Sequence, residues 1–155
     1  MVQFLRGVNI LYWCSRFRER REKSSLSISM MICLAVNREI VGEILKQTGA
    51  SVETAEDGEI CCSKVETMPA GYYDLILMDI MMPNMDGLEA ARRIRQLSDK
   101  GKAMIPIVAM TTNVSAVDRR NAKAAGMDGF TEKPILVESL FAVLRSFLQE
   151  RRQES

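Results

Sequence analysis

Hydrophobic and polar positions in this chain alternate between short apolar runs of strand length and longer segments with helical spacing. The apolar runs predict five strands, at about 28–36, 51–55, 75–78, 105–110 and 129–132. The third run, Leu75–Met78, has four apolar residues in unbroken succession and ends on Asp79. Such a run is typical of a strand buried on both faces, as in a parallel sheet.

The segments between these runs predict helices. Ile40, Val41, Ile44 and Leu45 recur at helical spacing after a capping residue at Asn37, and Asp86 and Glu89 have the spacing of a capping box. Further helices are expected at about 58–68, 115–125 and 136–148, whereas 99–102 reads as a polar loop. Alternating strands and helices with short connections predict a doubly wound α/β fold, a five-stranded parallel sheet with helices on both faces.

The chain of 155 residues is long enough for one domain and a short extra segment. We expect the domain at 26–150, a tail or linker at 1–25 and a charged tail at 151–155. The apolar part of 1–25 is too short to span a bilayer and lacks a signal-peptide cleavage site, although an amphipathic surface helix is conceivable. A mis-called start codon is a further alternative. The net charge of +1 gives no reason to expect nucleic acid or membrane as a partner.

Cysteine and histidine usage narrows the chemistry further. The four cysteines show no CxxC spacing, which favours a reducing, cytoplasmic location, and Cys61 and Cys62 read as half-buried helix residues. The chain contains no histidine. This excludes a histidine general base, a histidine metal ligand and a phosphohistidine within the sequence.

Three successive strands are expected to end in chemically useful groups: Asp79, Thr111 and Lys133. In a parallel sheet these strand ends share one edge, so the three side chains can converge. A carboxylate, a hydroxyl and an ammonium suit aspartyl-phosphate chemistry, because the carboxylate can attack a phosphoryl donor while the other two groups contact the phosphoryl oxygens. Each residue alone has a plain structural explanation, as a cap, a strand-end hydroxyl or a surface lysine.

Four stretches of the chain resemble the receiver domain of two-component response regulators and hybrid histidine kinases. They are Tyr73-Asp-Leu-Ile-Leu-Met-Asp79-Ile-Met-Met-Pro83, Met85-Asp-Gly-Leu-Glu89, Ile105-Pro-Ile-Val-Ala-Met-Thr111 and Lys133-Pro134. The resemblance covers about 37–148 and implies a flavodoxin-like strand order 2-1-3-4-5. It also implies a signalling domain that is not an enzyme.

The family's site residues carry over to matching positions. The resemblance implies that Asp79 accepts a phosphoryl group from a phosphohistidine on a histidine kinase or a histidine phosphotransfer protein. Thr111 would then bond the phosphoryl group and Lys133 would pair with it. Phe130 matches an aromatic switch that turns inward with Thr111, and the Lys133-Pro134 bond is expected to be cis. Because little chain follows Leu148, output is expected through a downstream protein partner that binds near the fourth helix and fifth strand.

One part of the family pattern is missing. Receiver domains hold Mg²⁺ with two acidic residues after the first strand, the phosphoacceptor and a backbone carbonyl, here that of Met81. Alignment on Asn37 puts Ile32 and Cys33 at the acidic positions, and neither is an oxygen ligand that Mg²⁺ prefers. Weak Mg²⁺ binding and poor phosphorylation are therefore expected. The domain is either naturally degenerate, or residues 1–35 come from a truncated or frame-shifted reading.

Two rival functions are considered. The first is a receiver-like protein-binding module that works without phosphorylation. The second is an aspartate-nucleophile phosphohydrolase. Such enzymes carry an Asp-x-Asp motif whose second Asp transfers a proton, and Met81 at that position disfavours this function. Nucleotide-binding motifs of the GxxxxGK[ST] and GxGxxG types are absent. Met78, Met81, Met82 and Met85 read as core and loop residues, and Arg92, Arg93 and Arg95 as a solvated helix face.

Overall fold

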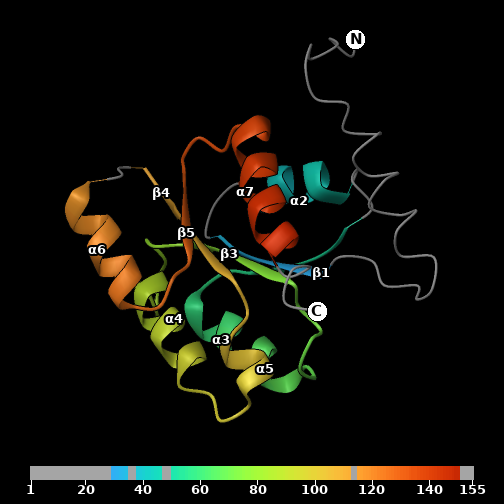
Figure 1. The fold of residues 1–155 in the computed structure, drawn as a ribbon, viewed down its shortest axis with the longest axis vertical. Helices are drawn as coiled ribbons and strands as arrows, with labels where there is room; N and C mark the ends of the chain where they lie inside the picture. The colour runs from blue at the N-terminus through green and yellow to red at the C-terminus, as the bar shows by residue number, and fades with distance from the viewer. Residues whose placement is uncertain (1–28, 35–37, 47–49, 113–114, 151–155) are drawn as a thin grey trace.

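The fold is a five-stranded parallel sheet with helices on both faces, as the sequence predicts (Figure 1). The computed structural model describes residues 29–34, 38–46, 50–112 and 115–150. The strands are β1 (Ser29–Cys33), β2 (Ser51–Ala55), β3 (Leu75–Asp79), β4 (Ile107–Thr111) and β5 (Gly129–Glu132). Their order is β2-β1-β3-β4-β5, so the implied order is confirmed.

Six helices lie in the described part of the chain: α2 (Arg38–Lys46), α3 (Gly58–Thr67), α4 (Gly87–Arg95), α5 (Lys100–Ala103), α6 (Ala116–Ala124) and α7 (Val137–Glu150). Helices α2 and α7 cover one face of the sheet, and α3, α4 and α6 cover the other (Figure 1). None of the helices in these ranges is long and apolar enough to cross a membrane.

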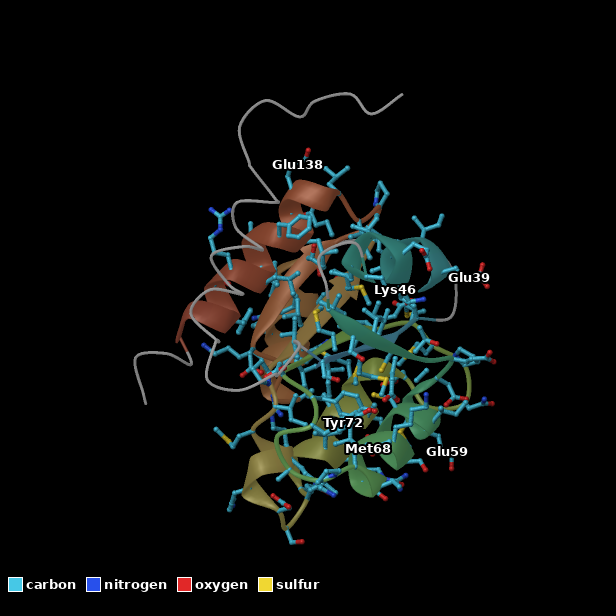
Figure 2. All side chains as sticks on the ribbon, turned by 90° about the vertical axis from the view of Figure 1, so that its right-hand side faces the viewer. Glu39, Lys46, Glu59, Met68, Tyr72 and Glu138 are labelled. Carbon is cyan, nitrogen blue, oxygen red and sulfur yellow. The ribbon has the colours of Figure 1, made fainter. Side chains whose placement is uncertain are left out.

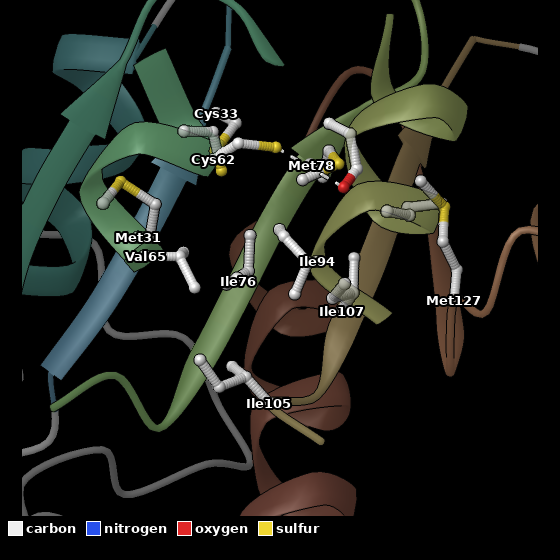
Figure 3. Packing of buried hydrophobic residues seen from close by; sticks show 14 of the residues in the cluster. Met31, Cys33, Cys62, Val65, Ile76, Met78, Ile94, Ile105, Ile107 and Met127 are labelled. Carbon is white, nitrogen blue, oxygen red and sulfur yellow. Dashed lines mark hydrogen bonds between the residues drawn. The ribbon is translucent and has the colours of Figure 1, made fainter. Parts of the chain in front are cut away.

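Two apolar clusters, one on each face, hold these layers together. On the α2 and α7 face, Leu75 and Leu77 of β3 pack with Leu140 and Leu144 of α7. On the other face, Ile76 and Met78 of β3 pack against α3 and α4, as Figure 3 shows. The central strand therefore buries both of its faces, which explains its unbroken apolar run. Charged side chains such as Glu39 and Glu138 point outward from the helices (Figure 2).

Helix boundaries follow the capping residues. Asp57, Asp86 and Ser115 each accept a hydrogen bond from a backbone N–H in the first turn of α3, α4 and α6. These bonds satisfy donors that have no partner within the helix. The capping role expected for Asp86 is confirmed, with the Glu89 N–H 2.8 Å from its Oδ1. Asn37, the cap expected for α2, and the predicted tail at 1–25 lie outside the described residues.

Several local predictions were wrong. The segment expected to be a polar loop contains the short helix α5, because the Asp99 carboxylate caps its first turn. Ile40 was assigned to the apolar stripe of α2 but is 62% exposed, since the buried face of that helix is carried by Val41 and Leu45. Leu136 likewise precedes α7 and is exposed.

Burial of the cysteines and arginines also differs from expectation. Cys61 and Cys62 are fully buried, because α3 lies flat against β1 and α4 (Figure 3). Arg95 does not belong to a solvated face. Its guanidinium donates to the carbonyl oxygens of Ala103, Ile105 and Gly126 and to the Asp128 carboxylate. It thereby joins the connection that precedes β4 to the connection that precedes β5.

Candidate functional site

Asp79 lies at the carboxyl end of the central strand β3 and is almost fully buried, with 4% of its surface exposed. One carboxylate oxygen, Oδ1, accepts a hydrogen bond from the backbone N–H of Met81 at 3.0 Å. The other, Oδ2, accepts from the ammonium of Lys133 in a direct ion pair. The buried carboxylate is thus matched by a positive charge, as a charge removed from water requires.

Lys133 reaches this position because β5 ends beside β4. The backbone N–H of Lys133 donates to the carbonyl oxygen of Thr111 at 2.8 Å, which continues the ladder by one residue. The following peptide bond, Lys133-Pro134, is cis, as expected. About a quarter of the Lys133 side chain is exposed to solvent. The proximity of the lysine and the aspartate, which the interpretation of the sequence required, is therefore present.

Thr111 ends the strand next to β3, and Phe130 lies on β5, opposite Ala109 of β4. Asp79 is paired with Met110 across β3 and β4, so Thr111 follows directly at the same edge and is half-buried. Phe130, on β5, is also half-buried, and the guanidinium of Arg119 on α6 lies 5.9 Å from its ring centroid. The carboxylate, hydroxyl and ammonium groups thus end three neighbouring strands at one edge of the sheet.

Gly87 is a residue whose role the sequence reasoning missed. A Cβ atom at this position would lie 2.2 Å from the carbonyl oxygen of Asp79, so no other residue fits without movement of the backbone. The Gly87 N–H also donates to the Ile80 carbonyl at 3.0 Å. This glycine therefore allows the start of α4 to pack directly on the strand end that carries the carboxylate. The Met85-Asp86-Gly87 motif was the feature of the sequence that could have indicated this role.

The positions where acidic metal ligands were expected are buried in the core. Ile32 packs in the cluster under α2 and α7, and Cys33 in the cluster under α3. Burial, a hydrogen bond with Cys61 and the neighbouring thiols raise the pKa of Cys33 well above its usual value. A protonated, buried thiol is a poor ligand for a hard cation.

The remaining donors do not make a magnesium site. Asp79 is already paired with Lys133, and the Met81 carbonyl adds only one further oxygen. Asp57, an acid in the turn after β2, uses one oxygen for Ile60 and the other for Asn84. Within the described ranges no group of three or more histidine, cysteine or acidic side chains is arranged to hold a metal ion. The residues present therefore do not fit Mg²⁺.

Comparison with known proteins identifies the family. A family profile described as the response regulator receiver domain matches residues 35–145. The two-component response regulator ORR41 of Oryza sativa is 40% identical over 114 residues, which cover 72% of this chain and 86% of that protein. The probable histidine kinase 4 of the same species is 34% identical over 131 residues, or 73% of this chain, but this chain spans only 13% of its length.

Solved structures give the same result. The chemotaxis protein CheY4 of Vibrio cholerae matches with a TM-score of 0.72 and 27% identity over 79% of this chain and 99% of that one. The receiver domain of the sensor histidine kinase PA1611 from Pseudomonas aeruginosa, solved with a magnesium ion in its active-site cleft, matches with a TM-score of 0.70 and 28% identity. The match spans 80% of this chain and 99% of the PA1611 receiver domain. The chain therefore belongs to the response regulator receiver domain family, the signalling domains of two-component phosphorelay systems.

Proposed function

We propose that Asp79 is the phosphoacceptor of a phosphorelay and that the chain, as its sequence stands, is phosphorylated poorly. The donor would be a phosphohistidine on a histidine kinase or a histidine phosphotransfer protein in the cytoplasm. The observation that carries the proposal is the ion pair between the buried Asp79 and the half-buried Lys133 at the carboxyl edge of the sheet. It combines a nucleophile with the cation that would meet the incoming phosphoryl group.

The residues at this edge have distinct tasks in the transfer. A carboxylate oxygen of Asp79 forms a bond to phosphorus while the phosphorus–nitrogen bond of the donor breaks, and the electron pair stays on the donor's imidazole. Lys133 then pairs with a phosphoryl oxygen, and the hydroxyl of Thr111 donates to another. Phosphorylation adds about two negative charges at the sheet edge, which biases the arrangement of Thr111 and Phe130 and the surface offered to a downstream protein partner.

The poor phosphorylation follows from the last two residues of β1, Ile32 and Cys33. Ile32 and Cys33 supply no carboxylate, so the charge on the transferred group is offset mainly by Lys133. Phosphoryl transfer depends almost entirely on positioning and electrostatic stabilisation. The loss of acidic ligands therefore lowers the rate, although the nucleophile is intact.

Labelling with acetyl phosphate tests the proposal. Purified chain is incubated with the donor over a range of Mg²⁺ concentrations, and the phosphate is located by mass spectrometry, with Asp79→Asn as the control. We expect slow labelling of Asp79 that changes little with Mg²⁺. Rapid, stoichiometric and Mg²⁺-dependent labelling would show that phosphorylation of Asp79 is not impaired. Complete absence of labelling at high donor concentration would show that Asp79 is not a phosphoacceptor.

A phosphorylation-independent binding module is the second candidate, and the apolar Ile32 and the buried Cys33 at the positions of the acidic ligands favour it. In that case Asp79→Asn leaves binding of a downstream partner unchanged. A phosphohydrolase is disfavoured, because Met81 occupies the position of the second acid and cannot transfer a proton; its side chain is 79% exposed.

The reading frame offers an explanation for the missing acidic pair. Methionine has a single codon, so Met30-Met31-Ile32 must be encoded by ATG-ATG-AT followed by A, C or T. Read two nucleotides later, the same DNA contains GAT-GAT, which encodes Asp-Asp. These two Asp codons overlap the codons of Met30, Met31 and Ile32, in a frame different from that of Asn37 and the following residues. This supports the hypothesis that residues 1–35 are grafted onto a functional receiver.

Sequencing of the genomic DNA and the transcript decides whether residues 1–35 come from a frame-shifted reading or belong to a naturally degenerate receiver. If the hypothesis holds, the GAT-GAT frame stays open upstream, encodes an apolar strand and joins the frame of residue 37 through a small insertion or deletion. A stop codon directly upstream in that frame would instead indicate a naturally degenerate receiver.

A further inference from the structure

The loop between β3 and α4, residues 80–86, connects the proposed phosphoacceptor to a second part of the molecule. At its start, the Met81 N–H donates to Oδ1 of Asp79 at 3.0 Å. Near its end, the side-chain amide of Asn84 donates to Oδ2 of Asp57 at 2.7 Å. The loop is thus tied to the nucleophile at one end and to the N-terminus of α3 at the other.

Asp57 uses its two oxygens for different purposes. Its Oδ1 accepts the N–H of Ile60 at 2.8 Å, which caps α3. Capping a helix requires one oxygen only, and the second is taken by Asn84. The residue is buried, with 6% of its surface exposed, and these hydrogen bonds, that of Ile60 first, lower its pKa. It is therefore a charged acceptor, which makes the stronger kind of hydrogen bond.

The backbone supports the same contact. The N–H of Gly58 donates to the carbonyl of Met85 at 3.1 Å. A Cβ atom at Gly58 would lie 2.7 Å from that carbonyl oxygen, so the loop and the helix end touch without space between them. Asn84 adopts a left-handed conformation, with φ of 61°, which asparagine tolerates better than most residues.

We propose that Asp57 and Asn84 are positioning residues for phosphoryl transfer to Asp79. Their hydrogen bond fixes the loop so that the Met81 N–H stays on one oxygen of the Asp79 carboxylate and sets its orientation. Because a displacement of about 1 Å at a reacting group can cost about a hundredfold in rate, holding this loop is part of the chemistry and not only of the fold. The inference rests on the proposed function of Asp79, but its structural part is tested separately.

An exchange of the two side chains provides the test. Asp57→Asn keeps the cap but places two amide donors opposite each other, and Asn84→Asp places two carboxylates opposite each other. The double variant D57N/N84D restores one donor and one acceptor in the same place, and an asparagine caps α3 equally well. Glu59→Gln, an exposed charge in the same helical turn (Figure 2), is the matched control.

Three quantities are measured for each variant: the melting temperature, the amide resonance of Met81 in a ¹H–¹⁵N spectrum, and the rate of Asp79 labelling by acetyl phosphate. We expect both single variants to shift the Met81 resonance and to slow labelling by about tenfold or more. The double variant is expected to restore both, and Glu59→Gln to leave both unchanged.

Two results would overturn the proposal. One is a Met81 resonance that neither single variant moves. The other is a double variant that regains the melting temperature but not the resonance and rate, which would reduce the pair to a structural contact. If the wild-type chain does not label at all, the phosphoacceptor role fails, and the Met81 resonance alone decides whether the pair positions the loop.

Discussion

Replacing Gly87 by alanine is expected to displace the strand end that carries Asp79. The added Cβ would lie 2.2 Å from the Asp79 carbonyl oxygen, whereas real Cβ atoms essentially never approach a heavy atom closer than 3.0 Å. The difference, 3.0 − 2.2 = 0.8 Å, is the least distance by which the backbone must separate. The atom it meets belongs to the backbone of a buried strand, so the movement cannot be absorbed by a flexible side chain.

Two effects follow from this displacement. Overpacking of this kind destabilises a domain by about 1–3 kcal/mol. A shift near 1 Å at the nucleophile is also expected to slow labelling of Asp79 by about a hundredfold. Urea unfolding measures the first effect, and the initial rate of labelling by acetyl phosphate, under conditions where each variant is fully folded, measures the second.

Gly42→Ala is the matched control for the same change of side chain. Gly42 lies inside α2, and a Cβ there meets nothing within 4 Å beyond its own helix backbone. Alanine in a helix interior is better than glycine by about 0.5–1 kcal/mol, so this variant is expected to be more stable and to label normally. If Gly87→Ala unfolds at the same urea concentration as the wild type and labels as fast as Gly42→Ala, the proposed close packing at Asp79 is wrong.

Three further predictions concern stability and pH. Thr131→Val is expected to raise the free energy of unfolding by about 1 kcal/mol, because the buried Thr131 hydroxyl has no hydrogen-bond partner among the described residues; a lower urea midpoint would contradict this. Arg95→Met is expected to cost about 2–4 kcal/mol, since it leaves three carbonyl groups without this donor and the Asp128 carboxylate with the Ile107 N–H alone, and thermal unfolding at neutral pH measures it. The lowered pKa of Asp57 stabilises the fold above about pH 3.9, the unfolded value, and this stabilisation is lost as the pH falls through the lower native pKa. Urea midpoints from pH 7 to pH 2 should therefore fall less steeply for Asp57→Asn than for the wild type.

The sequence by itself determined the five strands, the main helices and the placement of Asp79 and Lys133 at one edge of the sheet. The bounds of β2 and β5 agree with the predicted strands, since their apolar residues and their turn residues lie next to each other in the chain. Asp79 and Lys133 were also predictable, because parallel strands place their carboxyl ends on one edge. These properties depend on local periodicity and on a general rule of topology.

Only the tertiary structure decided which side chains touch. Arg95 lies on a helix whose arginines look solvated in sequence, yet it is half-buried and donates to the Ala103 carbonyl, eight residues away, and to the Gly126 carbonyl, 31 residues away. The contact of Gly87 with Asp79 and the bond of Asn84 to Asp57 likewise depend on how α3, α4 and β3 pack together. The physical reason is that hydrophobic spacing specifies which face of an element is buried, whereas the partner on that face is set by the packing of all the layers at once.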